Sequence, residues 1–588
     1  MNFNFSFVLI DEEMIILLRS QEIRKQGAEI DALRMGMDWK AEDLDKMQIV
    51  IANTYGNGHP GSFHLDKYVT LLKKELKDID VMGSRMTTSD ICDGIAQGHD
   101  GMNYSLVSRE MIANMVEIQA MAAPYDGIAL FSSCDKSVPA HLMSIMRLDL
   151  PAVHIPGGSM APGPDGLTLE MIGTYSAKLQ RGEITEEEFK KYQYSACPSC
   201  GACQFMGTAS TMQLMAEAMG LALPGAALIP STSPALSEMT KEAGHYLVDL
   251  VKKDLKPSDI ITRKSFENAM MIHAAIGGST NALLHIPAIA HEFGIEIELD
   301  EFDQIHRKIP FIANVKTSGK YPTHYFWYAG GLPAVMKELK DYLHLDQMTV
   351  TGKTLGENLE ELKKFSYLEY MESEAPTNLP NDVIYPAAEP INDEGSLAVL
   401  KGNLAPMGAV VKHSAVEPEM HQFKGKIKAF DTEEEAMEAV LSGDIVSGDA
   451  VIIRYEGPKG SGMPEMFYTS EAIASDEVLN TSTALITDGR YSGATRGPAI
   501  GHVSPEAVDG GPIALVEDGD LIEIDIPERK LNIIGIAGEE KSAAKIKKVL
   551  AERKEKWVKP KPKFNSGSLG LYVRHAVPAA KGAYIGMD

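Results

Sequence analysis

The chain contains few cysteines for its length: five among 588 residues. So small a number cannot supply the disulfide framework of a secreted protein. All five lie in Cys-Asp pairs or in one closely spaced run, and both contexts suit metal ligation. We therefore expect the protein to work in a reducing compartment, the cytoplasm.

Positive charge is also scarce. Lys and Arg number 56 against 82 for Asp and Glu, which gives a formal net charge of -26. A negative excess of this size repels polyphosphate backbones and anionic bilayers. The composition therefore argues against nucleic acid or a membrane surface as a partner, and it leaves small molecules as the expected ligands.

Internal repeats and low-complexity tracts are absent from the sequence, and so is a long uninterrupted apolar run. The start, MNFNFSFVLIDEEMIILLRS, lacks a basic leading stretch and is interrupted by Asp11, Glu12 and Glu13. We expect neither a signal peptide nor a membrane span there. With 44% hydrophobic and 23% charged residues, the composition is typical of a water-soluble globular protein.

A chain of 588 residues exceeds what one hydrophobic core usually supports, so we expect more than one domain. Up to about Leu362, the segments GIALF, VPAHLMSIMRL and PAVHIPGG predict strand, helix and strand, the pattern of a parallel α/β unit. Residues 373–394 are rich in Pro, Asn, Asp and Glu, which favours an extended connection. We place the boundary there, with an N-terminal α/β domain over 1–380 and a C-terminal domain over 381–588.

The C-terminal domain is expected to be β-rich. Short β-like segments separated by Gly-rich turns, among them AVVKH, DAVIIRYEG, TALITDG and DLIEIDI, predict a barrel-like sheet. Few helices are expected, one of them over residues 433–441. The tail after Lys559 is either a dimer arm or a loose end.

Two Cys-Asp pairs carry the first chemical signal. In FSSCDKSVPAHLM, Cys134, Asp135 and Lys136 follow a predicted strand over 128–131 and precede a helix, and ligand sites of α/β sheets lie at such strand ends. A thiolate and a carboxylate in succession place a soft ligand for iron beside a hard ligand for magnesium. A buried structural cysteine with a helix-capping aspartate is the alternative for this segment alone.

The second pair lies in SDICDGIAQGHDGM, where Cys92 precedes Asp93 and a glycine permits close backbone approach. Two such pairs are harder to explain as structural cysteines than one. His99 and Asp100 follow closely and are candidates for substrate contact, although polar loop residues are more often only solvated.

A third segment, ACPSCGACQFMGTASTMQLMAEAMG, spaces Cys197, Cys200 and Cys203 at two-residue gaps ahead of a helix predicted to end near Gly220. The amino terminus of a helix lowers a thiol pKa, so we expect a thiolate at Cys203. A structural zinc site remains open, but it needs another ligand that no nearby Cys or His pair provides. A ferredoxin-like carrier lacks its fourth cysteine, so three separated cysteines that leave one iron open are the preferred interpretation.

In the C-terminal half, YEGPKGSGMPEM places Glu465 behind a Gly-rich loop, and TDGRYSGATRG places Ser492 between Arg490 and Arg496. The first lacks the GK[ST] ending of a phosphate-binding Walker loop. The second lacks the glycine that a nucleophile elbow carries two residues before its serine. Taken singly, each is more typical of a tight turn than of a catalytic loop.

At these residues the chain closely resembles the dihydroxy-acid dehydratase and phosphogluconate dehydratase family. The likeness covers nearly the whole length, through CDGIAQGHDGM, SCDKSVPA, CQFMGTASTM, AIGGSTNALLHIPAIA, GPKGSGMPEM and TDGRYSGATRGPAIGHVSPEA. Within the family, GTASTM, MGMDWKAEDLDK, ENAMMIHAAIGGSTN and MTVTGKTLGENL are similar to the sugar-acid enzymes, the xylonate dehydratase branch in particular. A pentonate is therefore the first substrate expected.

The resemblance also implies the site. It implies an iron-sulfur cluster held by Cys134 and Cys203, Ser492 as the general base, and magnesium bound by Asp93, Asp135, a carbamoylated Lys136 and Glu465. Where dihydroxy-acid dehydratases carry a further cluster cysteine before an Asn-x-His-Leu segment, this chain reads HPGSFHL, with Gly61 in that place. Cys92 is the candidate for the third ligand and Cys200 the fallback, which leaves the cluster open between a favoured [2Fe-2S] and an alternative [4Fe-4S] form.

The expected function is a hydro-lyase that dehydrates an aldonic acid, D-xylonate or a similar pentonate or hexonate, to the 2-keto-3-deoxy acid. Magnesium would stabilise the charge that develops when C2 loses its proton, and Ser492 would need positive charge from magnesium, Arg490 or Arg496 to act as a base. The alternatives are a dihydroxy-acid dehydratase of branched-chain amino-acid synthesis and, in another class, a zinc or iron-sulfur binding or redox protein without lyase activity. Family likeness suggests a homodimer or a homotetramer.

Overall fold

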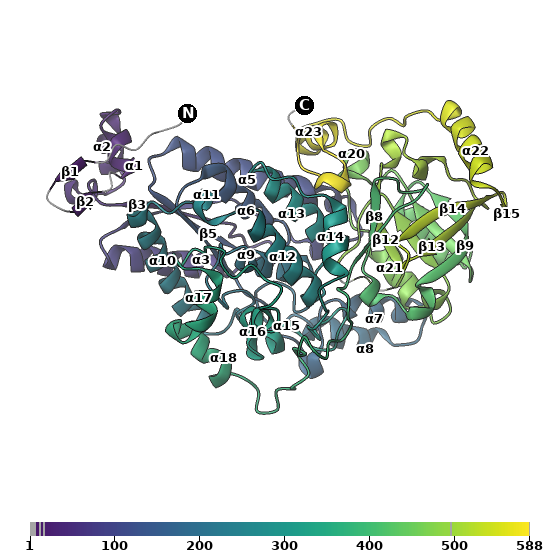
Figure 1. Cartoon of the computed structure of the whole chain (residues 1–588), viewed down its shortest axis with the longest axis horizontal. Coiled ribbons are helices and arrows are strands. Elements are labelled where there is room, and N and C mark those ends of the chain that lie inside the picture. Colours follow the sequence, from purple (N-terminus) through teal and green to yellow (C-terminus); the bar gives the residue numbers. More distant parts are fainter. Residues whose placement is uncertain (1–7, 11–12, 16–17, 494, 496, 587–588) are drawn as a thin grey trace.

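A computed structural model of the chain describes residues 8–10, 13–15, 18–493, 495 and 497–586 (Figure 1). Its N-terminal part is built on a four-stranded sheet in the order β4-β3-β5-β6, with every pair parallel. The bounds are Gln48–Asn53 for β3, Met82–Thr87 for β4, Gly127–Ser132 for β5 and Ala152–Pro156 for β6. Every residue of β3, β5 and β6 is buried, as expected of parallel strands covered on both faces.

The order of these strands reverses between β3 and β5. Right-handed crossovers place α3 (Leu65–Asp78) on one face of the sheet, and α5 (Ser105–Ala122) and α6 (Ser137–Leu148) on the other. α10 (Ala235–Lys253) packs beside α3, and α5 packs along α6. A reversal of this kind opens a crevice at the carboxyl ends of the strands, where α/β proteins bind ligands.

Further helices complete the N-terminal part. α9 is buried at every position, as is typical of a helix in the centre of a large core. The bounds of this group are α7 Met171–Gln180, α8 Glu186–Ser195, α9 Thr208–Ala218, α12 Arg263–Ile276, α13 Ala282–His291, α14 Leu299–His306, α15 Thr323–Tyr328, α16 Gly331–Glu338, α17 Leu355–Glu360 and α18 Glu369–Ser373.

Residues 374–397 contain neither a helix nor a strand, only isolated bridges such as that between Phe311 and Asn392. Beyond them the chain forms a nine-stranded mixed sheet in the order β15-β14-β13-β9-β10-β11-β12-β8-β7. Its bounds are β7 Ala398–Leu400, β8 Gly408–Val411, β9 Gln422–Phe430, β10 Asp449–Ile453, β11 Ala484–Thr487, β12 Ala499–Ser504, β13 Leu521–Asp525, β14 Lys530–Ile536 and β15 Glu539–Glu540.

This sheet curls until its two ends meet. The Lys401 N–H donates to the Arg529 carbonyl, and the Leu531 N–H donates to the Lys401 carbonyl, both at 2.9 Å. Alternate residues of the central strands face two different cores: Ala450 and Ile452 point into the curl, and their neighbours pack under α19 (Glu433–Ser442) and α21 (Phe467–Ala474). The expected fold class is therefore confirmed: an N-terminal parallel α/β part and a C-terminal β-rich, barrel-like part.

One predicted strand and one predicted helix are confirmed, one in each part of the chain. The predicted strand over 128–131 is β5, and the helix predicted over 433–441 is α19. The domain limits at 380 and 381 stay a prediction. Among the described residues, no helix is both long enough and apolar enough to cross a bilayer.

The C-terminal tail is not a loose end. Its helix α23 (Gly567–His575) packs against α5 and against the short helix α20 (Pro458–Ser461), with Leu569 and Tyr572 buried. The buried guanidinium of Arg109 on α5 donates to the carbonyls of Gly582 and Ala583 at 3.2 and 2.9 Å. The tail thus joins the C-terminal part to the N-terminal part within one chain.

Candidate functional site

The N-terminal part supplies two acidic loops at the carboxyl ends of β4 and β5, which lie on either side of β3 in the parallel sheet. After β4, Cys92 caps the short helix α4 (Asp93–Ala96), of which Asp93 is the first residue. After β5, Cys134 and Asp135 form the turn into α6, and Lys136 is the N-cap residue directly before that helix. Both Cys-Asp pairs therefore lie at the same edge of the sheet.

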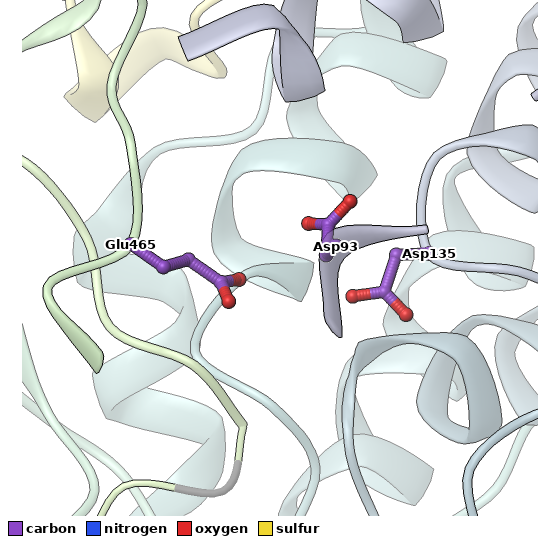
Figure 2. Close-up of side chains that lie close together, drawn as sticks. All are labelled: Asp93, Asp135 and Glu465. Carbon is purple, nitrogen blue, oxygen red and sulfur yellow. The ribbon is translucent and has the colours of Figure 1, made fainter. Parts of the chain in front are cut away.

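The C-terminal part adds a third carboxylate. Glu465 follows α20 and a left-handed turn at Gly462, where φ is +92°. Its strand-like backbone pairs with that of Arg490, since the Met466 N–H donates to the Arg490 carbonyl at 2.9 Å. Figure 2 shows that the side chains of Asp93, Asp135 and Glu465 lie close together. One carboxylate oxygen from each of the three lies within 4.8 Å of the other two.

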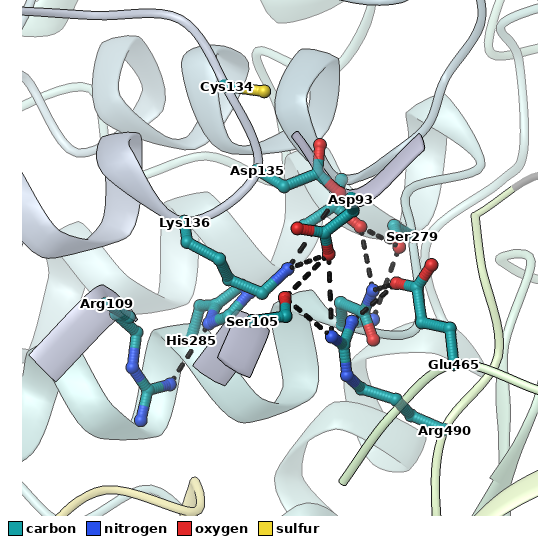
Figure 3. Close-up of polar contacts among 12 residues, drawn as sticks. Asp93, Ser105, Arg109, Cys134, Asp135, Lys136, Ser279, His285, Glu465 and Arg490 are labelled. Carbon is teal, nitrogen blue, oxygen red and sulfur yellow. Dashed lines mark hydrogen bonds and ion pairs between the residues drawn. The ribbon is translucent and has the colours of Figure 1, made fainter. Parts of the chain in front are cut away.

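Two buried cations balance part of this charge (Figure 3). The Lys136 amine donates to Asp93 Oδ2 at 2.7 Å, and the Arg490 guanidinium donates to Glu465 Oε1 at 2.5 Å and lies 3.5 Å from Asp93 Oδ2. Burial acts to raise the pKa of Asp93, but Lys136 and Arg490 outweigh it and hold that pKa below its usual value. Asp93 is therefore an anion.

Asp135 has the opposite environment. Burial, followed by the charges of Asp93 and Glu465, raises the pKa of Asp135 to about 7. In addition, Asp93 Oδ1 is buried without a hydrogen-bond partner among the described residues. Three converging carboxylates and an orphan carboxylate oxygen are the donor set that a hard divalent cation prefers.

Neutral side chains fix the outer oxygens of this cluster. Asn281 donates to Glu465 Oε1 at 2.8 Å, Gln97 donates to Glu465 Oε2 at 2.7 Å, and the Ser105 hydroxyl donates to Asp93 Oδ2 at 2.8 Å. No sequence motif had singled them out, although Asn281 lies in AIGGSTNALLH, Gln97 lies in CDGIAQGHDGM and Ser105 follows that segment. Polar residues inside the resembling segments were the signal that could have found them.

Three cysteines lie beside the carboxylates. Cys92, Cys134 and Cys203 line one cavity with Asp93 and Asp135. A hydrogen bond from the Cys134 thiol lowers the pKa of Cys92 to about 7 and raises the pKa of Cys134 well above its usual value.

One expectation for Cys203 is wrong. We expected a helix amino terminus to favour its thiolate, but α9 begins only at Thr208, and burial, with Cys92 and Asp135 nearby, raises the pKa of Cys203 well above its usual value. Desolvation penalises the charged form more than a helix end several residues away can favour it.

The other two cysteines and Gly61 are placed differently. Cys200 Sγ lies 3.9 Å from Ser231 Oγ and is not in the cavity wall, and Cys197 is exposed. A Cβ added at Gly61 would lie only 3.0 Å from Cys134 Sγ. Position 61, where the resemblance led us to expect a cluster cysteine, thus adjoins Cys134, and Cys92 lines the same cavity from the other loop.

The cavity has a volume of about 390 Å³. The three carboxylates, the three cysteines and Ser492 line it, together with the apolar side chains of Leu169, Ile172, Phe189, Phe205 and Phe467. His99 and Asp100 line a neighbouring cavity instead, and both are exposed. The guanidinium of Arg490 is directed at Glu465, Ser105 and the Met463 carbonyl, and Arg496 lies outside the described residues.

Comparison with known proteins bears on both parts of the chain. Residues 46–358 match the description "Dihydroxy-acid/6-phosphogluconate dehydratase N-terminal", and residues 382–583 match "Dihydroxy-acid/6-phosphogluconate dehydratase C-terminal". The chain is 44% identical over 574 residues to the dihydroxy-acid dehydratase of Caldanaerobacter subterraneus subsp. tengcongensis, which covers 96% of this chain and 99% of that protein. It is 45% identical over 551 residues to dihydroxy-acid dehydratase 1 of Methanosarcina acetivorans, covering 92% and 95%.

A further relative, the dihydroxy-acid dehydratase of Acetivibrio thermocellus, is 43% identical over 580 residues, covering 97% of this chain and 100% of that protein. These names favour the branched-chain alternative over the sugar-acid branch that the sequence first suggested. They also argue against a binding or redox protein without lyase activity. The chain belongs to the dihydroxy-acid/6-phosphogluconate dehydratase family, and it is a hydro-lyase.

Proposed function

We propose that this hydro-lyase dehydrates a branched-chain 2,3-dihydroxy acid of the size of 2,3-dihydroxyisovalerate to the 2-keto acid. One observation carries the proposal: a single cavity is lined both by carboxylates and cysteines and by the apolar side chains of Leu169, Ile172, Phe205 and Phe467. The apolar lining suits a hydrocarbon substituent, and the polar groups suit the carboxylate and hydroxyls of the acid. The names of the relatives support the same substrate class.

The residues present fit both implied metal groups. Asp93, Asp135 and Glu465 would hold magnesium, because they converge within 4.8 Å and the orphan Asp93 Oδ1 gains a partner. Lys136 would join them if carbon dioxide converts its amine into a carbamate, since an ammonium repels the cation whereas a carbamate offers it an oxygen.

The sulfur ligands we propose are Cys92, Cys134 and Cys203, because all three line the cavity. Cys200, the alternative third ligand, is less suitable because its sulfur faces Ser231. Three protein ligands leave one iron open to a substrate oxygen. A [2Fe-2S] cluster is the proposed form and [4Fe-4S] the alternative.

When bound, the two groups supply Lewis acidity toward the oxygens of the substrate. The protein's own residues do the rest. Arg490 and Asn281 hold Glu465, and Ser105 holds Asp93, so that the carboxylates keep their geometry before substrate enters. Ser492, in the wall of the same cavity, is the proposed base that takes the proton from C2.

A sugar acid remains the second candidate, because the same cavity also presents polar side chains. Gln97, Ser176, Gln193 and Ser210 line it and offer hydrogen bonds to hydroxyls at C4 and C5 that a branched-chain acid lacks. The sequence segments similar to xylonate dehydratases favour this candidate as well.

A direct competition separates the two. Holoenzyme reconstituted with iron, sulfide and magnesium is assayed for 2-keto acid formation from 2,3-dihydroxyisovalerate, D-xylonate, L-arabinonate and D-gluconate. We expect kcat/KM for 2,3-dihydroxyisovalerate to exceed that for every sugar acid by at least about tenfold, because hydroxyls buried against apolar walls lose their water. A higher kcat/KM for xylonate would replace the proposed substrate by the sugar acid, and failure to convert any of the four would contradict the proposal altogether.

We also propose a cellular compartment for the enzyme. All five cysteines are free, which suits a reducing compartment such as the cytoplasm. The homodimer or homotetramer expected from family likeness stays a prediction.

A further inference from the structure

Lys412 is a buried cation that has no role in the site described so far. It follows β8 directly, and only 8% of the residue is exposed. Its amine donates one hydrogen bond, to Thr317 Oγ1 at 3.3 Å, and forms no ion pair with any described residue. Burial lowers the pKa of Lys412 to about 7, so a large share of the side chain is a free amine at neutral pH.

A small cavity connects this amine to Ser492. Lys412, Ser492, Tyr491, Thr280 and His502 are among the residues that line it, and its volume of about 20 Å³ accommodates one water molecule. Ser492 also lines the large cavity of the site. The serine therefore lies between the substrate cavity and the cavity that Lys412 lines.

Unpaired polar atoms around the small cavity favour a bridging water. The Tyr491 hydroxyl and both ring nitrogens of His502 are buried without hydrogen-bond partners among the described residues. Buried polar groups in native proteins are nearly always satisfied, by protein or by ordered water. A water held by these groups would have the two to four polar partners that a buried water needs.

We propose that Lys412 accepts the hydroxyl proton of Ser492 through one bridging water and so makes Ser492 a base for the C2 proton. This inference rests on the proposed function, in which Ser492 takes that proton. A serine hydroxyl is too weakly acidic to lose its proton without a neighbouring base. The amine of Lys412 would be that base, as in serine-lysine pairs of other enzymes.

Ser492, the bridging water, Lys412 and the substrate exchange all the protons that the reaction needs. Ser492 Oγ passes its proton through the water to Lys412 Nζ and takes the proton of C2; the C–H electron pair becomes the C2=C3 bond as the C3–O bond breaks. The proton held by Lys412 returns by the same route to the departing hydroxide, which leaves as water. The enol then becomes the ketone when its O–H proton is lost and C3 is protonated, and Lys412 ends as the free amine.

The titratable groups that face Lys412 do not compete for this role. Burial lowers the pKa of His502 to about 3 and that of His273 to about 4, so both are neutral over the working range. Burial raises the pKa of the Tyr491 hydroxyl well above its usual value, and it lowers the pKa of the adjacent His413 to about 4. Among these groups, only Lys412 changes charge near neutral pH.

A purely structural role is the competing explanation. The Thr317 hydroxyl, which accepts from Lys412, donates to the Gly493 carbonyl at 2.9 Å, so the lysine also braces the loop that carries Ser492. Loss of that brace would lower activity without changing its dependence on pH. The test therefore needs the pH profile as well as the rate.

The test compares Lys412→Met with wild-type holoenzyme on the substrate that the wild type converts best. We expect kcat to fall by about 100-fold or more, the usual contribution of a general base, with KM and the absorption of the cluster retained. The acid limb of the wild-type kcat/KM profile, near pH 7, should disappear. Lys401→Met is the control: Lys401 follows the neighbouring strand β7, and its only ion pair among the described residues is with the exposed Asp300. Its kcat and pH profile should match the wild type.

Lys412→Arg covers the case in which the methionine variant does not fold. Arginine keeps the positive charge and most of the bulk but cannot give up its proton, so it should lose the same activity and the same acid limb. In a Ser492→Ala background, Lys412→Met should cause no further loss, because both changes remove one step. Wild-type kcat with an intact acid limb in either Lys412 variant overturns this inference alone, whereas wild-type holoenzyme inactive on every substrate of the panel overturns the proposed function and this inference with it.

Discussion

Glu465→Gln tests whether the C-terminal part completes a cation site. The substitution keeps the shape of a side chain that is 2% exposed but removes its charge. Glu465 accepts hydrogen bonds from Arg490, Asn281 and Gln97, so the new amide group must face at least one donor. It also leaves Arg490 positive and 3.5 Å from Asp93, where it repels a bound cation.

Losing one charge-assisted interaction of this kind costs about 1.5–3 kcal/mol, which corresponds to a Kd for magnesium about 10- to 150-fold higher. The absorption of the cluster should not change, since no cysteine is altered. Calorimetric titration of magnesium into chelator-treated protein, with activity followed against magnesium concentration, measures the shift.

Glu217→Gln is the matched control. Glu217 is also a buried glutamate, but it lies in the core of the N-terminal part and accepts the Gly225 and Ala227 N–H groups. It should leave the affinity for magnesium unchanged. An unaltered magnesium Kd in Glu465→Gln, with the control behaving as stated, would refute a cation site that spans the two parts.

Three further predictions follow from the same geometry. Ser492→Ala should lower kcat by about 100- to 10,000-fold while the absorption spectrum of the cluster persists; near-normal turnover would remove Ser492 from the reaction. Cys92→Ser should reduce iron content and bleach the cluster, whereas Cys200→Ser, whose sulfur faces Ser231, should retain both; the reverse result would exchange the two assignments. Burial raises the pKa of Glu217 from 4.5 to about 8, so this carboxyl ionises at lower pH in the unfolded chain than in the folded one. Thermal stability should therefore fall as pH rises from about 4.5 to about 8, and Glu217→Gln should flatten that fall. An unchanged slope in Glu217→Gln would contradict this effect of burial.

The fold class and the position of the site at strand ends were accessible from the sequence because both depend on local periodicity. The apolar run GIALF is β5, and Cys134 and Asp135 follow directly after it, as the strand-turn-helix pattern requires. The second Cys-Asp pair follows β4, and parallel strands bring their carboxyl ends to one edge. Two short motifs far apart in the chain could therefore be predicted to meet.

The rest depends on contacts that no local pattern encodes. Only the family resemblance, and no local pattern in GPKGSGMPEM, indicated that Glu465 meets Asp93, and nothing indicated that a buried ion pair joins Arg490 to Glu465. The pKa of Cys203 could not be judged from a nearby helix, because desolvation depends on side chains brought in from other loops. The buried amine of Lys412 was equally hidden, since AVVKH is an ordinary β-strand sequence until the curled sheet encloses its end.

We propose that iron held by thiolates and a cation held by carboxylates lie side by side in one cavity. Crystals of the reconstituted holoenzyme, measured above and below the iron absorption edge, test it most directly. We expect an anomalous iron peak in contact with the sulfur atoms of Cys92, Cys134 and Cys203. A lighter cation should lie beside it, among Asp93, Asp135 and Glu465. Iron bound at Cys197 and Cys200 instead, or a zinc edge in place of an iron edge, would contradict it.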